Sequence, residues 1–283
     1  MIDGWIIEVN WYSREYWLVK GYEHPEGQVV AVPYYVGSKR WDPSDYLSHP
    51  LAPSTTRFLE CVGRLVPLVE ESRISMRVDP ESAYKARVED LPREIIELIE
   101  ILGPEYVGIS GSWAIFKEKK GSDVDLMIYT ARHRDAYRAL ASLEEEGLVA
   151  RGRAPRRGEN PFPGKLLEAS YKGVPYTLKI LRHVERLPCT RRLSPYGVYV
   201  GPLRILDRSE GHLYPARYRA LIGYPGRASE VVVETWRTRY LELREGHYYS
   251  RLELFYDSNA GLIIASTDIG GWIKKEDGAS RGP

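Results

Sequence analysis

Two carboxylates one residue apart, at the start of an apolar strand, are the residues of this sequence best placed to do chemistry. They belong to Ser122-Asp123-Val124-Asp125, which begins ten residues after Ser112. Side chains at positions i and i+2 of a strand point to the same face, so Asp123 and Asp125 would lie side by side and repel one another. A divalent ion relieves such repulsion, and Mg²⁺ often joins carboxylates to the phosphates of a substrate. We therefore expect Asp123 and Asp125 to bind Mg²⁺ or Mn²⁺.

The dipeptide Gly111-Ser112 offers a complementary phosphate site. It follows the apolar strand 106–110 and opens a short helical segment, where free backbone N–H groups favour phosphate. We expect Gly111, Ser112 and, in the loop that follows, Lys120 and Ser122 to contact a nucleoside triphosphate. The alternative is a Gly-Ser turn, an exposed lysine loop that also contains Lys117 and Lys119, and a polar start to a strand.

The stretch 111–129 resembles the signature of the DNA polymerase β-like nucleotidyltransferase superfamily: Gly-Ser, a spacer of near-fixed length, Ser-Asp-x-Asp, and an apolar strand. The resemblance covers roughly residues 88–182. It implies a small α/β core with a mixed sheet, and transfer of a nucleoside monophosphate from an NTP to a hydroxyl with two metal ions and release of pyrophosphate. The whole chain also resembles, more loosely, an archaeal-type branch that wraps this core in β-rich segments.

Two positions depart from the family pattern. Many members have a glycine four residues after the motif serine, where this chain has Phe116. Members usually carry a third carboxylate on a later strand, but the strand 174–181 offers only Thr177 and Lys179. If Lys172-Gly173 is a two-residue hairpin turn, Glu168 pairs with Thr177 and brings a third catalytic carboxylate from the neighbouring strand. The alternative is that Glu168 is a solvated strand residue.

The surrounding pattern predicts an α+β fold in three regions: residues 1–87, β-rich with one helix; 88–190, the nucleotidyltransferase core; and 191–283, an all-β domain. The predicted helices are a segment after Ser54 that runs to Pro67, 90–102 capped by Asp90, and 131–146 capped by Thr130. Pro33 marks the strand 29–36 as an edge or a bulge. Since sheet edges are usually covered, we expect at least one β-rich flank to pack on the core.

The composition is that of a folded protein, with 43% hydrophobic and 28% charged residues and a net charge of +1. The sequence shows neither a membrane span nor a signal peptide, so the expectation is a cytoplasmic protein without membrane partners. The two cysteines, Cys61 and Cys189, lie far apart in the chain, which argues against a disulfide framework and against a zinc site.

A cluster of arginines lies between the core and the all-β region. Its members could bind triphosphate or the backbone of an RNA acceptor, or form a solvated loop; they are Arg151, Arg153, Arg156 and Arg157, with Arg182, Arg186, Arg191 and Arg192 further on. The 21 tyrosines and 7 tryptophans could stack unpaired bases or fill the cores of thin sheets. The sequence thus favours a metal-dependent nucleotidyltransferase. The alternatives are a degenerate nucleotide- or RNA-binding protein and an antitoxin-like or regulatory partner of another protein.

Overall fold

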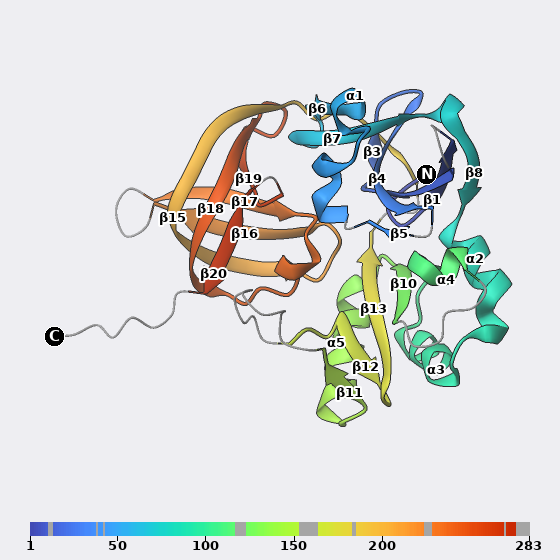
Figure 1. Cartoon of the computed structure of the whole chain (residues 1–283). Helices are drawn as coiled ribbons and strands as arrows, with labels where there is room; N and C mark the ends of the chain where they lie inside the picture. The colour runs from blue at the N-terminus through green and yellow to red at the C-terminus, as the bar shows by residue number, and fades with distance from the viewer. Residues whose placement is uncertain are drawn as a thin grey trace. The chain divides into compact units, whose positions relative to one another are not determined.

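The computed structural model describes residues 1–10, 14–37, 39–41, 43–116, 123–152, 164–182, 185–223, 228–268 and 270–275, in which strands form four sheets and helices are short (Figure 1). The chain divides into two compact units. The N-terminal unit comprises residues 1–150 and 166–190, and the C-terminal unit comprises residues 151–165 and 191–283. The predicted boundary between residues 87 and 88 falls inside the N-terminal unit.

The first sheet of the N-terminal unit has the strand order β6-β7-β4-β2-β1-β8, with β5 also paired to β4. Its strands are β1 (Ile6–Asn10), β2 (Arg14–Val19), β4 (Gln28–Val36), β5 (Lys39–Arg40), β6 (Thr56–Leu59), β7 (Arg64–Glu70) and β8 (Ile74–Val78). The same unit contains the two-stranded ribbon of β3 (Glu23–His24) and β14 (Leu187–Pro188), the 3₁₀ turns η1 (Pro43–Ser48) and η2 (Glu71–Arg73), and α1 (Ala52–Thr55). Pro33 lies at a register shift between β2 and β4, so the predicted bulge is confirmed.

The predicted helix after Ser54 is wrong. Only the short α1 is helical, and the chain then forms the hairpin β6–β7, in which Thr56 pairs with Pro67. Gly63 adopts φ +64° in the turn between the strands, which suits a glycine rather than the interior of a helix. The apolar run was therefore a hairpin, and β-branched residues such as Thr56 and Val66 were its strand signal.

The second sheet has the order β11-β12-β13-β10-β9, with β10 and β13 parallel. Its strands are β9 (Tyr106–Ile109), β10 (Val124–Tyr129), β11 (Val149–Arg151), β12 (Glu168–Tyr171) and β13 (Val174–Leu181). The helices of this region are α2 (Pro80–Arg87), the 3₁₀ turn η3 (Val88–Asp90), α3 (Arg93–Leu102), α4 (Gly111–Ile115) and α5 (His133–Glu145). Mixed α and β structure is thus observed, as predicted.

Two of these helices were predicted and one was not. Helix α3 lies within the predicted range, but Pro92 rather than Asp90 occupies its N-cap position. Arg132 rather than the predicted Thr130 occupies the N-cap position of α5, although the backbone N–H of Arg132 donates to Thr130 Oγ1 at 3.0 Å. Helix α2 was not predicted, although Asp79 is a normal N-cap signal and accepts hydrogen bonds from the backbone N–H groups of Glu81 and Ser82.

The N-terminal sheet packs on the second sheet, as expected for at least one β-rich flank. A buried cluster on the first sheet contacts Ala114, Ile115 and Phe116 at the end of α4; its members are Ile6, Leu18, Val32, Tyr34 and Tyr35. The ring of Phe116 meets that of Tyr35 edge to face at 5.0 Å. The aromatic residue that departs from the family pattern therefore joins the two sheets.

The described residues of the C-terminal unit form strands and one 3₁₀ turn, which agrees with the predicted all-β region. Its strands are β15 (Leu193–Glu210), β16 (Ala216–Ile222), β17 (Ser229–Thr235), β18 (Gly246–Asp257), β19 (Leu262–Ser266) and β20 (Trp272–Lys275), with the 3₁₀ turn η4 (Thr238–Tyr240). Pairing in the order β15-β16-β17-β19-β18 closes on itself, because β18 also pairs with β15. Strands β17 and β19 are parallel, and β20 extends one edge of β18. The result is a five-stranded closed barrel.

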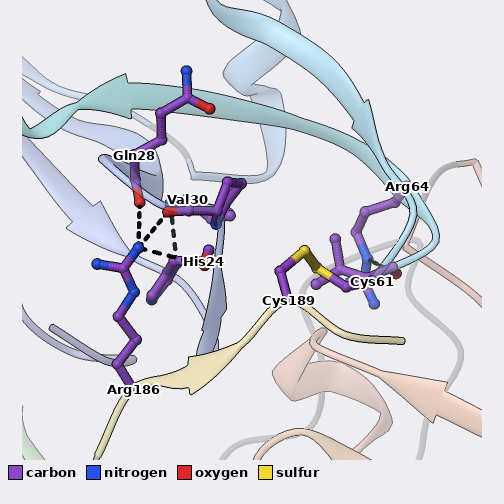
Figure 2. Close-up of a disulfide and its surroundings, with 9 residues drawn as sticks. His24, Gln28, Val30, Cys61, Arg64, Arg186 and Cys189 are labelled. Carbon is purple, nitrogen blue, oxygen red and sulfur yellow. Dashed lines mark hydrogen bonds between the residues drawn. A yellow bond between two sulfur atoms is a disulfide. The ribbon is translucent and has the colours of Figure 1, made fainter. Parts of the chain in front are cut away.

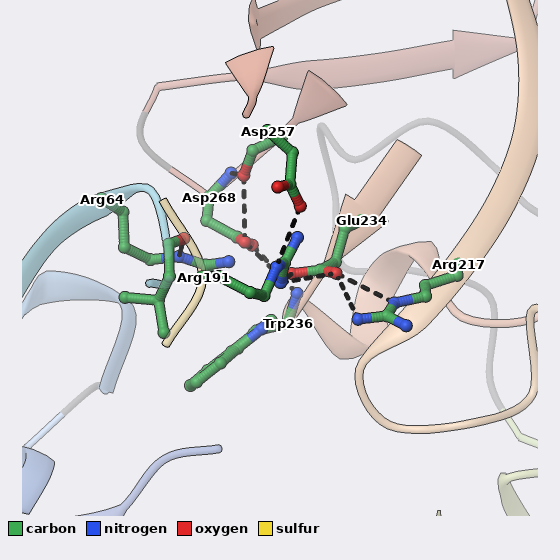
Figure 3. Close-up of polar contacts among 9 residues, drawn as sticks. Arg64, Arg191, Arg217, Glu234, Trp236, Asp257 and Asp268 are labelled. Atoms are coloured by element: carbon green, nitrogen blue, oxygen red, sulfur yellow. Dashed lines mark hydrogen bonds and ion pairs between the residues drawn. The ribbon is translucent and has the colours of Figure 1, made fainter. Parts of the chain in front are cut away.

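An ion-pair network ties four segments of this barrel together (Figure 3). Arg191 lies 3.3 Å from the carboxylate of Glu234 and 3.5 Å from that of Asp257, and Arg217 pairs with Glu234 at 2.9 Å. Glu234 is buried. Arg191, one of the arginines considered for phosphate binding, therefore has a structural role in the barrel.

The two cysteines form a disulfide, which overturns the expectation from their wide spacing (Figure 2). Cys61 lies in the β6–β7 turn and Cys189 follows β14, so the bond closes the N-terminal unit across 128 residues of sequence. Nearby, Arg186 pairs with Glu71 at 2.6 Å and donates to the carbonyl oxygens of Pro25 and Gln28. Sequence spacing gave no signal for the disulfide because tertiary folding alone brings these segments together.

Candidate functional site

The carboxylates of Asp123 and Asp125 lie where β10 begins, beside the junction of β9 and α4. The backbone N–H of Ser110 donates to the carbonyl oxygen of Asp125 at 2.9 Å, so Gly111 comes next to the carboxylate strand. Asp123 is exposed, and the hydroxyl of Thr177 on β13 donates to its Oδ2 at 2.7 Å. Thr177 lies on the strand on which a third carboxylate would be expected from the resemblance. Its hydroxyl instead orients one carboxylate of the pair.

The backbone at Gly111 is in direct contact with Asp125. Gly111 has φ +65°, and a Cβ atom at this position would lie 1.8 Å from Asp125 Oδ2. Both the left-handed conformation and the lack of space therefore require glycine. Ser112 is buried in the first turn of α4. The structure brings Gly111, Ser112, Asp123 and Asp125 together, as the sequence analysis expected.

Glu168 lies in the predicted register. Lys172 and Gly173 both have positive φ in the turn between β12 and β13, and Glu168 pairs with Thr177. Thr177 also pairs with Asp125, so Glu168 and Asp125 share one face of the sheet. Two strand spacings separate them, about 10 Å between Cα atoms. Its role as a third carboxylate stays a prediction.

A lysine and a buried aspartate lie on the same face as the carboxylates. Lys179, two residues after Thr177 on β13, places Nζ 2.9 Å from Asp3 Oδ1, and Asp3 is fully buried. The other oxygen of Asp3 accepts the backbone N–H of Gly21 at 2.9 Å. The hydroxyl of Ser110 donates to the carbonyl oxygen of Gly4 at 2.7 Å. The N-terminal segment is therefore part of the site.

The site brings both signs of charge into a buried environment. Burial, and then the negative charge of Asp123, raises the pKa of Asp125 to about 6, while the positive charges of Lys179, Arg40 and Lys20 oppose the rise. Burial and the neighbouring Lys179 lower the pKa of Lys20 to about 8. Several cationic side chains thus lie close enough to the carboxylate pair to oppose its charge. Asp3, Lys20 and Arg40 carry no signal of a site in the sequence, because only tertiary contacts bring the N-terminal sheet to β10.

Asp123 and Asp125 fit one divalent ion. They supply two adjacent carboxylates. Burial, and then the charge of Asp123, raises the pKa of Asp125, and a cation would relieve the repulsion between the two. In the part of the chain that the structure describes, no group of three or more His, Cys, Asp and Glu side chains is arranged to hold a metal ion. The described side chains therefore fit one ion at the pair, and a second ion would depend on oxygen ligands from substrate phosphates.

The other residues considered for binding are elsewhere or outside the described ranges. Lys117, Lys119, Lys120 and Ser122, like Arg153, Arg156 and Arg157, lie outside the described residues. Arg151, at the end of β11, donates from Nη1 to the carbonyl oxygen of Gly164 at 2.9 Å. Its contact with phosphate or nucleic acid stays a prediction.

Comparison with protein-family models, with curated proteins and with solved structures found no match for this chain. Across the described residues, no helix is long and apolar enough to cross a membrane. The functional argument therefore rests on the geometry of the site.

The raised pKa of Asp125 predicts a pH-dependent stability in the absence of divalent ions. Because the folded state holds this proton more tightly than the unfolded state, the stabilisation is complete below about pH 4 and is lost as the pH rises through about 6. A shift of this size corresponds to roughly 3 kcal/mol.

We expect Asp125→Asn to raise the unfolding temperature relative to the native chain at pH 7.5 but not at pH 4, measured by calorimetry in EDTA. A difference that does not change with pH would contradict the burial of this charge. The lowered pKa of Lys20 acts above pH 8 and leaves this window undisturbed.

Proposed function

We propose that the chain is a metal-dependent nucleotidyltransferase that moves a nucleoside monophosphate from an NTP to a hydroxyl acceptor, on a core of the polymerase β-like type. The observation that carries the proposal is the contact of the Gly111 backbone with Asp125, beside Asp123. It joins the two halves of the sequence motif, the Gly-Ser turn and the carboxylate strand, into one site. The mixed sheet with a parallel β10–β13 pair supports the same core.

The residues of the site have complementary roles in this reaction. Asp123 and Asp125 would hold Mg²⁺ or Mn²⁺, which when bound neutralises phosphate charge and activates the acceptor oxygen. Thr177 keeps Asp123 in place through its hydrogen bond. The absence of a side chain at Gly111 lets the carboxylate of Asp125 lie against the backbone, and the Ser112 hydroxyl would donate to phosphate.

The lysines supply positive charge where the triphosphate would lie. Lys179 is held by Asp3. Burial, and then the charge of the neighbouring Lys179, lowers the pKa of Lys20. Charge-assisted hydrogen bonds from ammonium groups to phosphate oxygens are strong, and they are stronger in a partly buried site. These contacts would orient the leaving pyrophosphate, since catalysis of phosphoryl and nucleotidyl transfer depends mainly on positioning and electrostatics.

A second candidate function is nucleotide binding without chemistry. The observation that favours it is on β13, where Thr177 and Lys179 stand in place of the third acid, and where no three-acid group is found among the described side chains. Glu168 is the residue that separates the two functions, because it shares the face of Asp125. An active enzyme that loses activity in Glu168→Gln would assign it the role of the missing acid.

The proposal is tested by incubating the full chain with each α-labelled NTP, Mg²⁺ or Mn²⁺, and a panel of RNA, protein and small hydroxyl acceptors. We expect label on one class of acceptor with release of pyrophosphate, and none with the variant Asp123→Asn/Asp125→Asn. Metal-dependent binding of NTP without transfer to any acceptor would favour the second candidate. Transfer that survives the double variant would exclude this site.

A further inference from the structure

The C-terminal barrel carries a charge that the net charge of the chain conceals. Residues 151–165 and 191–283 contain 19 lysines and arginines against 12 aspartates and glutamates, a formal charge of +7. The N-terminal unit contains 21 basic against 27 acidic residues, a formal charge of −6. An excess of basic residues confined to one unit indicates an anionic partner for that unit.

Two tyrosines line a hollow of about 450 Å³ on the barrel, near the turn between β18 and β19. Tyr196 is 63% exposed and Tyr256 is 41% exposed. Tyr256 pairs with Ile263 on β19, and Tyr196 lies at the register shift between Pro195 and Gly197 on β15. Exposed aromatic rings gathered at one hollow are unusual on a folded unit and mark a binding surface.

A second hollow of about 540 Å³ lies next to the first, and Val232 and Leu262 line both. Its charged lining consists of Arg191, Arg217 and Arg219 together with the carboxylates of Asp207, Glu210 and Asp257. The side chains of Arg217 and Arg219 are 42% and 58% exposed, and each is oriented by an ion pair, with Glu234 and Glu230 respectively. A guanidinium has five N–H donors, so a pair with one carboxylate leaves donors that face solvent. Guanidinium groups therefore line the hollow next to the one that holds the two tyrosine rings.

We infer that these two hollows form a binding site for single-stranded nucleic acid, in which Tyr196 and Tyr256 stack unpaired bases and Arg217 and Arg219 contact the phosphate backbone. Non-specific single-strand binding combines such stacking rings with basic side chains that contact the backbone. Five-stranded barrels are one of the scaffolds on which it occurs, although a fold alone does not establish it. The charge of +7 favours a polyanion over a neutral sugar or a second copy of this basic unit. The inference rests on the barrel alone and does not depend on the proposed nucleotidyl transfer.

The test is fluorescence anisotropy of the full chain with 15-nucleotide labelled oligo-U and oligo-dT, and with a duplex of the same length, over a range of salt concentrations. We expect single strands to bind more tightly than the duplex. Tyr196→Ala and Tyr256→Ala should each weaken binding about tenfold, since stacking on one ring is worth that much or more. The Phe variants keep the ring and should retain affinity. Arg219→Ala should reduce the dependence of affinity on salt.

Tyr106→Ala is the matched control, because Tyr106 is also highly exposed, at 48%, but lies in the N-terminal unit. It should leave binding unchanged, as should Asp123→Asn/Asp125→Asn, so that failure of this inference and failure of the proposed transferase site are distinguishable. Equal affinity for duplex and single strands, or affinity that is indifferent to both tyrosine-to-alanine changes, would overturn the inference. The inference would also be overturned if the chain bound no oligonucleotide but self-associated, and if the same tyrosine changes abolished that self-association. The surface would then be an interface with a second copy of the chain.

Discussion

Replacing Gly111 by alanine is expected to weaken Mg-ATP binding roughly 100-fold, because a displacement of about 1 Å in a preorganised site can cost that much. The new Cβ atom would lie 1.8 Å from Asp125 Oδ2 and 2.7 Å from its Cγ. The side chain of aspartate is too short to move aside without taking the carboxylate out of the site. Calorimetric titration of Mg-ATP into the native chain and the variant measures the effect.

The chain offers a matched control for backbone strain. Gly147 has φ +76°, similar to that of Gly111, but a Cβ atom there would meet nothing within 4 Å. Gly147→Ala therefore introduces the same left-handed alanine, at about 1 to 2 kcal/mol, without a steric contact. It should leave Mg-ATP binding unchanged. If both alanine variants weaken binding equally, strain alone would account for the result, and the contact with Asp125 would have no part in it.

Removal of the disulfide is expected to have the largest effect on stability. In the chain-entropy account, a bond that closes a loop between Cys61 and Cys189, at a sequence separation of 128, contributes about 4 to 5 kcal/mol. For a unit of this size, such a loss lowers the unfolding temperature by about 10 °C or more. Differential scanning calorimetry of Cys61→Ser/Cys189→Ser, and of the native chain with and without a reductant, would measure it.

The serine variant provides its own control, because a reductant should not change its unfolding temperature. Reduction that leaves the native chain as stable as before would show that the bond contributes nothing to folding. The C-terminal unit contains neither cysteine, so its binding of oligonucleotides at 25 °C should be the same in both proteins.

The sequence predicted the parts of the site that depend on local pattern. Strand alternation placed Asp123 and Asp125 on one face, and the two-residue turn at Lys172-Gly173 fixed the register that brings Glu168 opposite Thr177. Turn geometry determines register over a short hairpin, so counting outward from the turn was sufficient.

The wrong or missing predictions concern features that depend on contacts between distant segments of the chain. The helix predicted after Ser54 is a hairpin because Cys61 and Gly63 form a turn that pairs β6 with β7. Asp3 and Lys20 reach the site only because the first sheet packs on α4 and β13. Periodicity carries no information on such packing, since tertiary contacts override local propensity.

The central claim is that Asp123 and Asp125 form a metal-dependent nucleotide site, and calorimetric titration of Mg-ATP into the full chain tests it most directly. We predict saturable binding that requires Mg²⁺ and that is lost in Asp123→Asn/Asp125→Asn, while the unfolding temperature of that variant is equal or higher, because repulsion between the carboxylates is removed. Asp135→Asn, which changes an exposed aspartate on α5, should bind as the native chain does. Equal binding of Mg-ATP by the native chain and the double variant would contradict the account.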